Sequence, residues 1–336
     1  MKHEFLISLP YLLMIGMVAL GSLWMMPATA ASGDADAPLR DGQVLSVWPG
    51  VAPGSEGLSF TEEVNERSEE PEKLKDRAVV KILRPTLTVY RPENPNGAAL
   101  LVVPGGAYQR VVIDKEGDEL SPWLKSLGIT FFVLRYRLPG DGHRQAADVP
   151  LQDAQRALRL IRKNAASWGL DPKRLGVMGF SAGGHVASSL AVKYNQKVYE
   201  PLDIVDAVSA RPDFLVLGYP VITMRDRYAH PGSRAELLGK NPTPQQLDAY
   251  SNELFITRDT PPAFIMHAGD DSSVPVENAL RFYLGLRDAG VPAELHIFKE
   301  GGHGFSIRLA KGKTAENWTL LCGEWFRAIG VAGPRP

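Results

Sequence analysis

The residues best suited to chemistry begin with a serine between small residues, in the run Gly179-Phe180-Ser181-Ala182-Gly183. A short apolar run, residues 175–178, precedes this pentapeptide, and a segment of small residues, 184–192, follows it. That order predicts a strand, a sharp turn and a helix, with the serine at a strained position that excludes bulky neighbours two residues away. A serine hydroxyl is a poor nucleophile at neutral pH, so it needs a base, and the base needs an orienting acid.

The predicted base is a histidine near the end of the chain. Seven histidines are available: His3, His143, His185, His230, His267, His296 and His303. Only His303 lies in a loop after the last predicted strand, and the glycines on both sides of it let the backbone approach the nucleophile. His296 lies inside a predicted strand and His267 ends one, which favours a core or surface role for both.

The orienting acid should follow the predicted strand at residues 263–267. Two adjacent candidates stand there, Asp270 and Asp271. Neighbouring side chains in an extended or turn segment point apart, so only one of the two can face His303. The residues alone leave either aspartate open.

An acyl-transfer site also needs amide donors for the oxyanion of the tetrahedral intermediate. One donor should be the amide of Ala182, directly after the nucleophile, and the others should follow the strand that ends at residue 103. Gly105-Gly106-Ala107 is that loop. Alone it would be an ordinary glycine-rich turn, but together with Ser181 and His303 in this chain order it is predicted to form an oxyanion hole.

The segments that must position these groups alternate between strand and helix patterns. Strands are predicted at residues 79–83, 86–90, 98–103, 129–134, 175–178, 214–218, 263–267 and 293–298. Helices are predicted at residues 115–127, 148–168, 184–192, 276–289 and 315–329. This alternation predicts an α/β fold with a mostly parallel central sheet covered by helices on both faces.

The ends of the catalytic part are predicted from composition. Residues 5–26 are almost wholly apolar, and Ala28-Thr29-Ala30 fits a signal-peptidase site, so residues 1–30 are predicted to be a signal peptide, with a retained membrane anchor as the alternative. Either way we expect an exported, periplasmic or extracellular protein. Residues 31–77 are predicted to be a linker and surface segment, residues 78–332 the catalytic domain, and residues 223–262 an insertion that covers a pocket at the carboxyl edge of the sheet.

Charge and cysteine content limit the partners. The 336 residues carry a formal net charge of −1, which gives no sign of nucleic-acid binding or of attraction to an anionic membrane. The single cysteine, Cys322, excludes an internal disulfide and a multi-cysteine metal cluster. The predicted chemistry needs no metal or cofactor, and the oligomeric state is left open.

Three sequence runs carry a resemblance to a known family: Leu151-Gln152-Asp153-Ala154-Gln155-Arg156-Ala157, Gly179-Phe180-Ser181-Ala182-Gly183-Gly184-His185 and Gly301-Gly302-His303-Gly304-Phe305. Over residues 80–330 the chain resembles α/β-hydrolases of the acetyl-xylan-esterase and feruloyl-esterase-like type. The resemblance implies an α/β-hydrolase fold and a Ser-His-Asp esterase. Asp153 and Arg156 are expected to make structural contacts within this frame.

The resemblance also assigns individual residues. The family's Pro-Gly-Gly-Gly-Tyr segment is Pro104-Gly105-Gly106-Ala107-Tyr108 here, which implies Gly106 and Ala107 as oxyanion donors beside Ala182. The run from His267 to Pro275 is similar to a His-Gly-x-x-Asp-x-x-Val-Pro pattern, and this favours Asp271 over Asp270 as the acid.

The expected activity is deacetylation of plant polysaccharide or its oligosaccharides through an acyl-enzyme. Alternatives are a feruloyl or short-chain carboxylesterase, a peptidase, or a non-catalytic protein on a hydrolase fold. Tyr108, Glu116 and His230 are candidates for contact with the acylated carbohydrate or small ester substrate, because they are expected near the mouth of the site.

Overall fold

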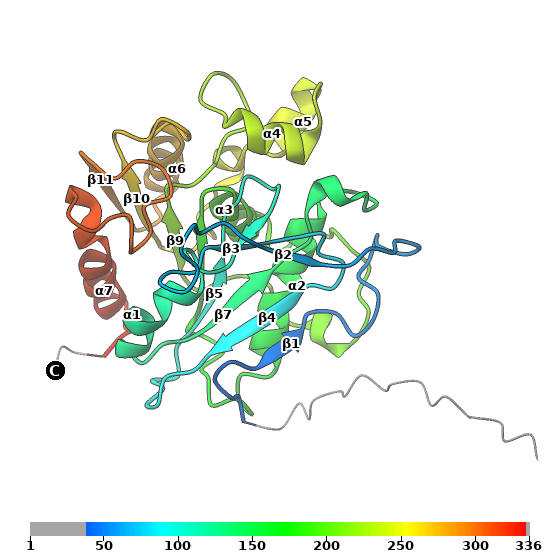
Figure 1. Ribbon diagram of the computed structural model, residues 1–336, viewed down its shortest axis with the longest axis horizontal. Coiled ribbons are helices and arrows are strands. Elements are labelled where there is room, and N and C mark those ends of the chain that lie inside the picture. The colour runs from blue at the N-terminus through cyan, green and yellow to red at the C-terminus, as the bar shows by residue number, and fades with distance from the viewer. Residues whose placement is uncertain (1–37, 334–336) are drawn as a thin grey trace, which may run out of the picture. The chain divides into compact units, whose positions relative to one another are not determined.

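An eight-stranded sheet carries the functional groups, and the computed structural model describes it within residues 38–333 (Figure 1). In spatial order the strands are β1 (Val44–Ser46), β4 (Thr86–Tyr90), β7 (Thr130–Arg135), β5 (Ala99–Val103), β8 (Leu175–Phe180), β9 (Leu215–Gly218), β10 (Ala263–Ala268) and β11 (Ala293–Phe298). β4 runs antiparallel to both of its neighbours, and the strands from β7 to β11 pair in parallel. The predicted mostly parallel sheet is confirmed.

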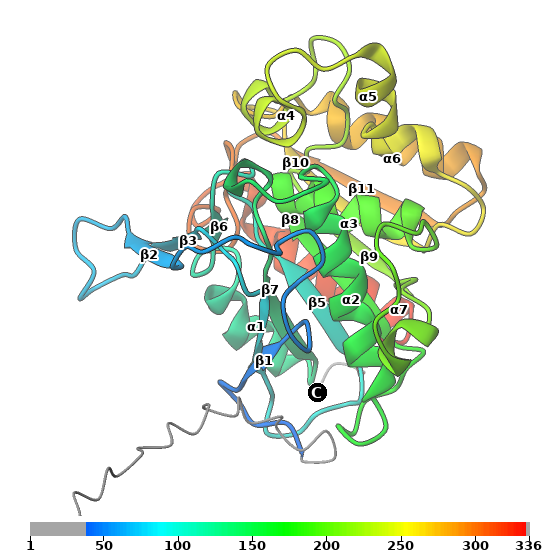
Figure 2. The ribbon, with the colours of Figure 1, turned by 90° about the vertical axis from the view of Figure 1, so that its right-hand side faces the viewer.

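Helices cover both faces of the sheet, because the buried strands present apolar side chains on each face. On one face, Leu101 and Val103 of β5 join a core with α2 (Val149–Lys163), α3 (Ala182–Lys193) and α6 (Glu277–Asp288). On the other, Leu100 and Val102 pack with α1 (Ser121–Ser126) and α7 (Trp318–Ala328). Figure 2 shows α2 and α3 in front of the sheet. The inner strands, such as β5 and β8, are thus fully buried, and the carboxyl edge of the sheet is left for the loops that carry the polar residues.

The predicted domain boundary at residue 78 is too late in the chain. β1 pairs with β4, and Trp48 is buried in the core, where its indole N–H donates to Asp153 at 2.7 Å. A second, three-stranded antiparallel sheet is formed by β2 (Glu63–Glu66), β3 (Arg77–Val80) and β6 (Val111–Val112). Residues 38–77 therefore belong to the same folded unit, and the high charge of this segment reflects ion pairs that hold a hairpin.

The segment 115–127 is less helical than its pattern predicts. Only α1 and a preceding 3-10 helix, Asp118–Leu120, form there, while Lys115 and Glu116 lie in a turn that reaches towards the carboxyl edge. Gly117 has φ −137° and ψ −87°, which is not a helical conformation, so a helix cannot run through this residue.

The predicted insertion folds into short helices. α4 (Pro231–Leu238), α5 (Pro244–Ala249) and the 3-10 helix Asn252–Phe255 lie beyond the carboxyl end of the sheet in both views (Figures 1 and 2). Within residues 38–333, no helix has the length and apolar character needed to cross a membrane. The predicted signal peptide, residues 1–30, lies outside the described residues.

Candidate active site

Ser181 stands at the turn between β8 and α3, in a backbone conformation that few non-glycine residues adopt, with φ 53° and ψ −122°. Such a conformation costs about 1–3 kcal/mol, which the surrounding packing must offset. The start of α3 packs tightly against the end of β5, since a Cβ on Gly183 would lie only 2.1 Å from the carbonyl oxygen of Val103. The missing side chain lets α3 begin directly against the end of β5, and this aims the serine out of the sheet edge.

The structure brings the three predicted catalytic side chains together. The Ser181 Oγ lies 2.8 Å from His303 Nε2, and His303 Nδ1 lies 2.8 Å from Asp271 Oδ2. The imidazole is partly open, with a quarter of its side chain exposed, whereas the Asp271 side chain is fully buried. A carboxylate only accepts, so Nδ1 carries the proton and Nε2 is the acceptor that faces the serine.

Asp271 is surrounded by donors. Its Oδ1 accepts from the amides of Ser273 and Val274, both at 2.9 Å, and its Oδ2 lies 3.2 Å from His267 Nε2 in addition to His303. Burial alone would raise the pKa of this carboxyl, but hydrogen bonds from His267 and His303, together with the charge of His303, lower the pKa well below its usual range. The group stays ionised and ready to stabilise an imidazolium.

Two neighbours of the acid have roles that residue types alone did not reveal. Asp270 points the other way and accepts from the amides of Gly301 and Gly302 at 3.0 and 2.8 Å, so it braces the loop that carries His303. Of the core and surface roles expected for His267, the structure shows the first: its side chain is buried, and it also contacts Asp271. The signal that could have found this contact is the spacing, since His267 precedes Asp271 by four residues across a tight turn.

The loop at residues 104–108, which we call the oxyanion loop, passes beside the serine. A Cβ on Gly105 would lie 2.8 Å from the Ser181 Cβ. Among the described residues, no protein acceptor takes the amides of Gly106, Ala107 or Ala182. Free amides beside an alcohol that is bonded to an imidazole are the arrangement used in acyl transfer.

Glu116 lies beneath the oxyanion loop and not at its mouth, which corrects the prediction that its side chain contacts substrate. Its carboxylate is 3% exposed and accepts from the Gly105 amide at 2.7 Å and from the Tyr219 hydroxyl at 2.9 Å. The Tyr219 ring meets the His303 ring edge to face, with centroids 5.3 Å apart. Glu116 therefore supports both the oxyanion loop and the packing around the imidazole.

Tyr108 is also turned inward, so its predicted contact with substrate is corrected as well. It is 1% exposed, and its hydroxyl lies 2.7 Å from His185 Nδ1. At the other end of the loop, the Tyr136 hydroxyl donates to the Pro104 carbonyl at 2.9 Å. Position in the sequence could not reveal these directions, because they depend on the backbone turn of the loop.

His230 is the residue directly before α4, and it lies close enough to the triad for the charge of His303 to affect its pKa. Its Nδ1 accepts from the Ser233 amide at 3.1 Å, which caps the helix. Burial, and then the nearby charge of His303, lower the pKa of His230. The ring is half-buried, and its contact with substrate stays a prediction.

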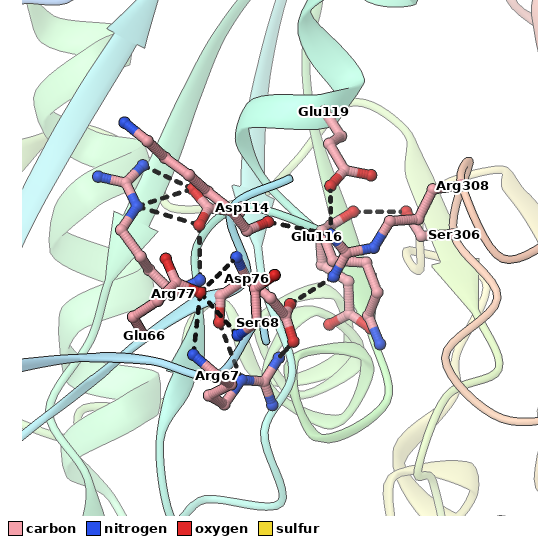
Figure 3. Close-up of polar contacts among 12 residues, drawn as sticks. Glu66, Arg67, Ser68, Asp76, Arg77, Asp114, Glu116, Glu119, Ser306 and Arg308 are labelled. Carbon is pink, nitrogen blue, oxygen red and sulfur yellow. Dashed lines mark hydrogen bonds and ion pairs between the residues drawn. The ribbon is translucent and has the colours of Figure 1, made fainter. Parts of the chain in front are cut away.

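The loop that carries His303 is tied to the N-terminal hairpin by polar contacts drawn in Figure 3. The Ser306 hydroxyl donates at 2.7 Å to the carbonyl of Lys115, the residue directly before Glu116. Arg308 pairs with Asp76 and, at 3.0 Å, with Glu119. No group of three His, Cys, Asp or Glu side chains that could hold a metal ion occurs in residues 38–333.

Comparisons with known proteins agree with this arrangement. The sequence profile of the BD-FAE family matches residues 87–286, and that of the dienelactone hydrolase family matches residues 249–329. Over 72% of its length, the chain is 38% identical to an acetylxylan esterase of Xylanibacter ruminicola. Over 62%, it is 40% identical to endo-1,4-beta-xylanase B of Butyrivibrio fibrisolvens. The matches span 48% and 32% of those two relatives.

A solved structure matches over almost its whole length. The acetyl ester-xyloside bifunctional hydrolase of Caldicellulosiruptor lactoaceticus is 37% identical, with a TM-score of 0.72, and the match covers 87% of this chain and 98% of that one. The shared part is therefore the entire folded unit of that protein and not one segment of it.

Proposed function

The chain belongs to the BD-FAE family of α/β-hydrolases, and we propose that it is an exported serine carboxylesterase that removes acetyl groups from plant polysaccharide. The observation that carries the proposal is the continuous chain of hydrogen bonds from Ser181 through His303 to Asp271, with 2.8 Å at each link. Free amides beside the serine complete the requirements for ester hydrolysis.

In the first half of the reaction the Ser181 oxygen attacks the acyl carbonyl while His303 Nε2 takes its proton. The buried Asp271 carboxylate stabilises the imidazolium that forms. The amides of Gly106, Ala107 and Ala182 donate hydrogen bonds to the carbonyl oxygen, which becomes negatively charged. His303 then gives the proton to the leaving sugar hydroxyl, and an acyl-enzyme remains. In the second half, water attacks the acyl group with His303 again as base, and acetate leaves.

The substrate class is supported by the relatives and not by a bound ligand. One relative is named an acetylxylan esterase and the structural neighbour an acetyl ester-xyloside hydrolase, so acetylated xylan or its oligosaccharides are the proposed substrates. Export is supported by the apolar segment at residues 5–26 and the small residues that follow it. Feruloyl esters, simple short-chain esters and peptide amides are the competing substrates.

The test uses the full folded chain and a substrate panel. We expect acetate release from acetylated xylan to exceed ferulate release from arabinoxylan and cleavage of peptide amides. Ser181→Ala should lose at least about four orders of magnitude in kcat while its unfolding curve matches wild type, because the triad acts as a unit. A fluorophosphonate should label wild type at Ser181. Normal turnover by the alanine variant would show that Ser181 is not the nucleophile. Faster release of ferulate or of peptide products than of acetate would show that acetylated xylan is not the preferred substrate.

A further inference from the structure

The oxyanion loop has an unusual backbone. Three successive residues have positive φ: Gly106 at 136°, Ala107 at 58° and Tyr108 at 62°. Glycine is required at the first, since a Cβ there would lie 2.2 Å from the Arg110 carbonyl oxygen. For the other two this conformation costs about 1–3 kcal/mol each, and it persists only where the surroundings over-determine it. Something must therefore hold Tyr108.

The side chains of Tyr108 and His185 form a chain of hydrogen bonds in which each donor and acceptor can be assigned. His185 Nε2 lies 2.7 Å from the backbone carbonyl of Tyr250, and a carbonyl only accepts, so Nε2 carries a proton. Burial lowers the pKa of His185 to about 3, so the ring is neutral at working pH and its Nδ1 is a bare acceptor. The Tyr108 hydroxyl must then donate to Nδ1, at 2.7 Å.

A hydrogen bond adds to the packing that holds the Tyr108 side chain, which is buried and meets the Tyr136 ring edge to face. A cavity of about 120 Å3 borders Tyr108, His185 and Tyr250. Protein interiors normally leave few voids larger than a water molecule, so the ring has space on this side that close contact would otherwise deny it. On the side that borders the cavity, the hydrogen bond to His185 is the contact that fixes the phenol hydroxyl.

The far end of the chain is in the insertion. Tyr250 directly follows α5, and its own hydroxyl donates to Asp148 at 2.7 Å, which anchors it to the start of α2. His185 lies on α3 one turn after Ser181. The path thus runs from the insertion, through the helix behind the nucleophile, to the residue next to a proposed oxyanion donor.

We propose that Tyr108 and His185 are positioning residues for the oxyanion hole, which hold the amides of Gly106 and Ala107 in place by a one-way hydrogen-bond chain that ends at the Tyr250 carbonyl of the insertion. The inference rests on the proposed function, because it assigns a task to the amides of that same site. Neither side chain touches the substrate. Their effect reaches the reaction through the backbone of residues 106–108.

The test compares Tyr108→Phe, His185→Leu and the double variant with Tyr199→Phe. Tyr199 is the matched control, since its buried ring also carries a bonded hydroxyl, 2.6 Å from Asp206, but lies away from the oxyanion loop. Loss of a whole oxyanion donor costs about 10²–10³ in kcat, so partial misplacement should lower kcat about tenfold with KM within twofold. Affinity for a trifluoromethyl ketone, whose hemiketal oxygen occupies the hole, should fall by the same factor.

The double variant separates positioning from simple stability. The double variant leaves neither the Tyr108 hydroxyl nor the ring nitrogen unpaired, although the Tyr250 carbonyl loses its donor wherever His185 is replaced. Its unfolding free energy should therefore be at least that of His185→Leu, while its kcat stays as low as that of the single variants. A kcat for Tyr108→Phe equal to that of Tyr199→Phe would overturn the inference.

Hydrogen exchange decides the matter even if no ester is turned over. The amides of residues 104–110 should exchange faster in Tyr108→Phe and His185→Leu than in Tyr199→Phe. Unchanged exchange in an active enzyme refutes the inference alone. A wild type without ester turnover refutes the proposed function, and faster exchange in the two variants would still support the structural link.

Discussion

Two loops meet at Ser181, and different interactions hold them. The oxyanion loop is fixed from beneath by three buried side chains: Tyr136, Glu116 and His185. The loop at residues 301–308, which we call the histidine loop, is fixed by the carboxylates of Asp270 and Asp271, by the hydrogen bonds of Ser306 and, farther out, by the ion pairs of Arg308. Buried hydrogen bonds are costly to leave unmade, whereas partly exposed ion pairs are weak and screened by salt. The amides are thus held rigidly, and the imidazole is held at its base and more loosely at its periphery.

The largest expected effect is at the base of the histidine loop. In Asp271→Asn the amide nitrogen can donate to His303 Nδ1, which would leave the proton on Nε2, where it cannot accept one from Ser181. Loss of the correct tautomer in this way costs about 10⁴ in kcat in a comparable triad. Steady-state kinetics with an acetyl ester would measure it.

Asp270→Asn is the matched control for this prediction. Its remaining oxygen can still accept from the amides of Gly301 and Gly302, so kcat should fall less than about tenfold. If Asp270→Asn lost as much activity as Asp271→Asn, the assignment of the two aspartates would be reversed.

The next effect is beneath the oxyanion loop. In Glu116→Gln, only one acceptor oxygen remains, so the Gly105 amide keeps its partner only if the Tyr219 hydroxyl turns round to accept from the new amide nitrogen. The loop should shift by a fraction of an ångström, and kcat should fall about 10- to 100-fold with little change in KM. Because the contact is buried, the loss should be the same at low and high salt.

The exposed Glu93 provides the control for Glu116. Glu93→Gln removes the same charge from the chain but should leave kcat unchanged. If Glu116→Gln showed wild-type kcat, the oxyanion loop would hold its shape without a support from beneath, and the contrast between the two loops would disappear.

The sequence predicted the parts of this site that leave a local pattern. Parallel strands buried on both faces appear as apolar runs, and chain order was enough to choose Ser181 and His303, which the structure brings into contact. Side-chain directions leave no such pattern. Glu116 and Tyr108 were placed at the mouth, but the left-handed turn at residues 106–108 and the inward reach of residue 116 bury both. The edge strand β1 was missed because it is only three residues long.

The two loops should also respond differently to acid. His185 has its pKa lowered by burial to about 3, against about 6.5 in an unfolded chain, so below pH 6.5 only the unfolded state takes up this proton. Stability supported by the neutral His185 therefore falls as pH drops from about 6.5 towards 3. Asp271 works in the same sense but over a lower pH window: its lowered pKa adds stability above about pH 4, and this is lost only at lower pH.

Urea unfolding at pH 7 and pH 5 would separate the two contributions. Between these values the free energy of unfolding should drop less in His185→Leu than in wild type, since the variant has no buried imidazole to keep neutral. Asp271→Asn should keep the wild-type difference over the same interval. If the free energy of unfolding dropped equally in wild type and His185→Leu, the neutral His185 ring would not be the source of this pH dependence.

The smallest effect is expected at the periphery of the histidine loop. Arg308 is 17% exposed at its side chain, and its partners Asp76 and Glu119 are 22% and 21% exposed. Pairs of this kind contribute about 0–1 kcal/mol, so Arg308→Met should lower kcat no more than about threefold at low salt. At 1 M NaCl, where the Debye length is about 3 Å, the difference between variant and wild type should shrink, because salt screens the part of the pairing that faces solvent. A loss that persists in high salt would mean that Arg308 acts through packing or its hydrogen bond to the Lys75 carbonyl, and that the histidine loop is held as firmly as the oxyanion loop.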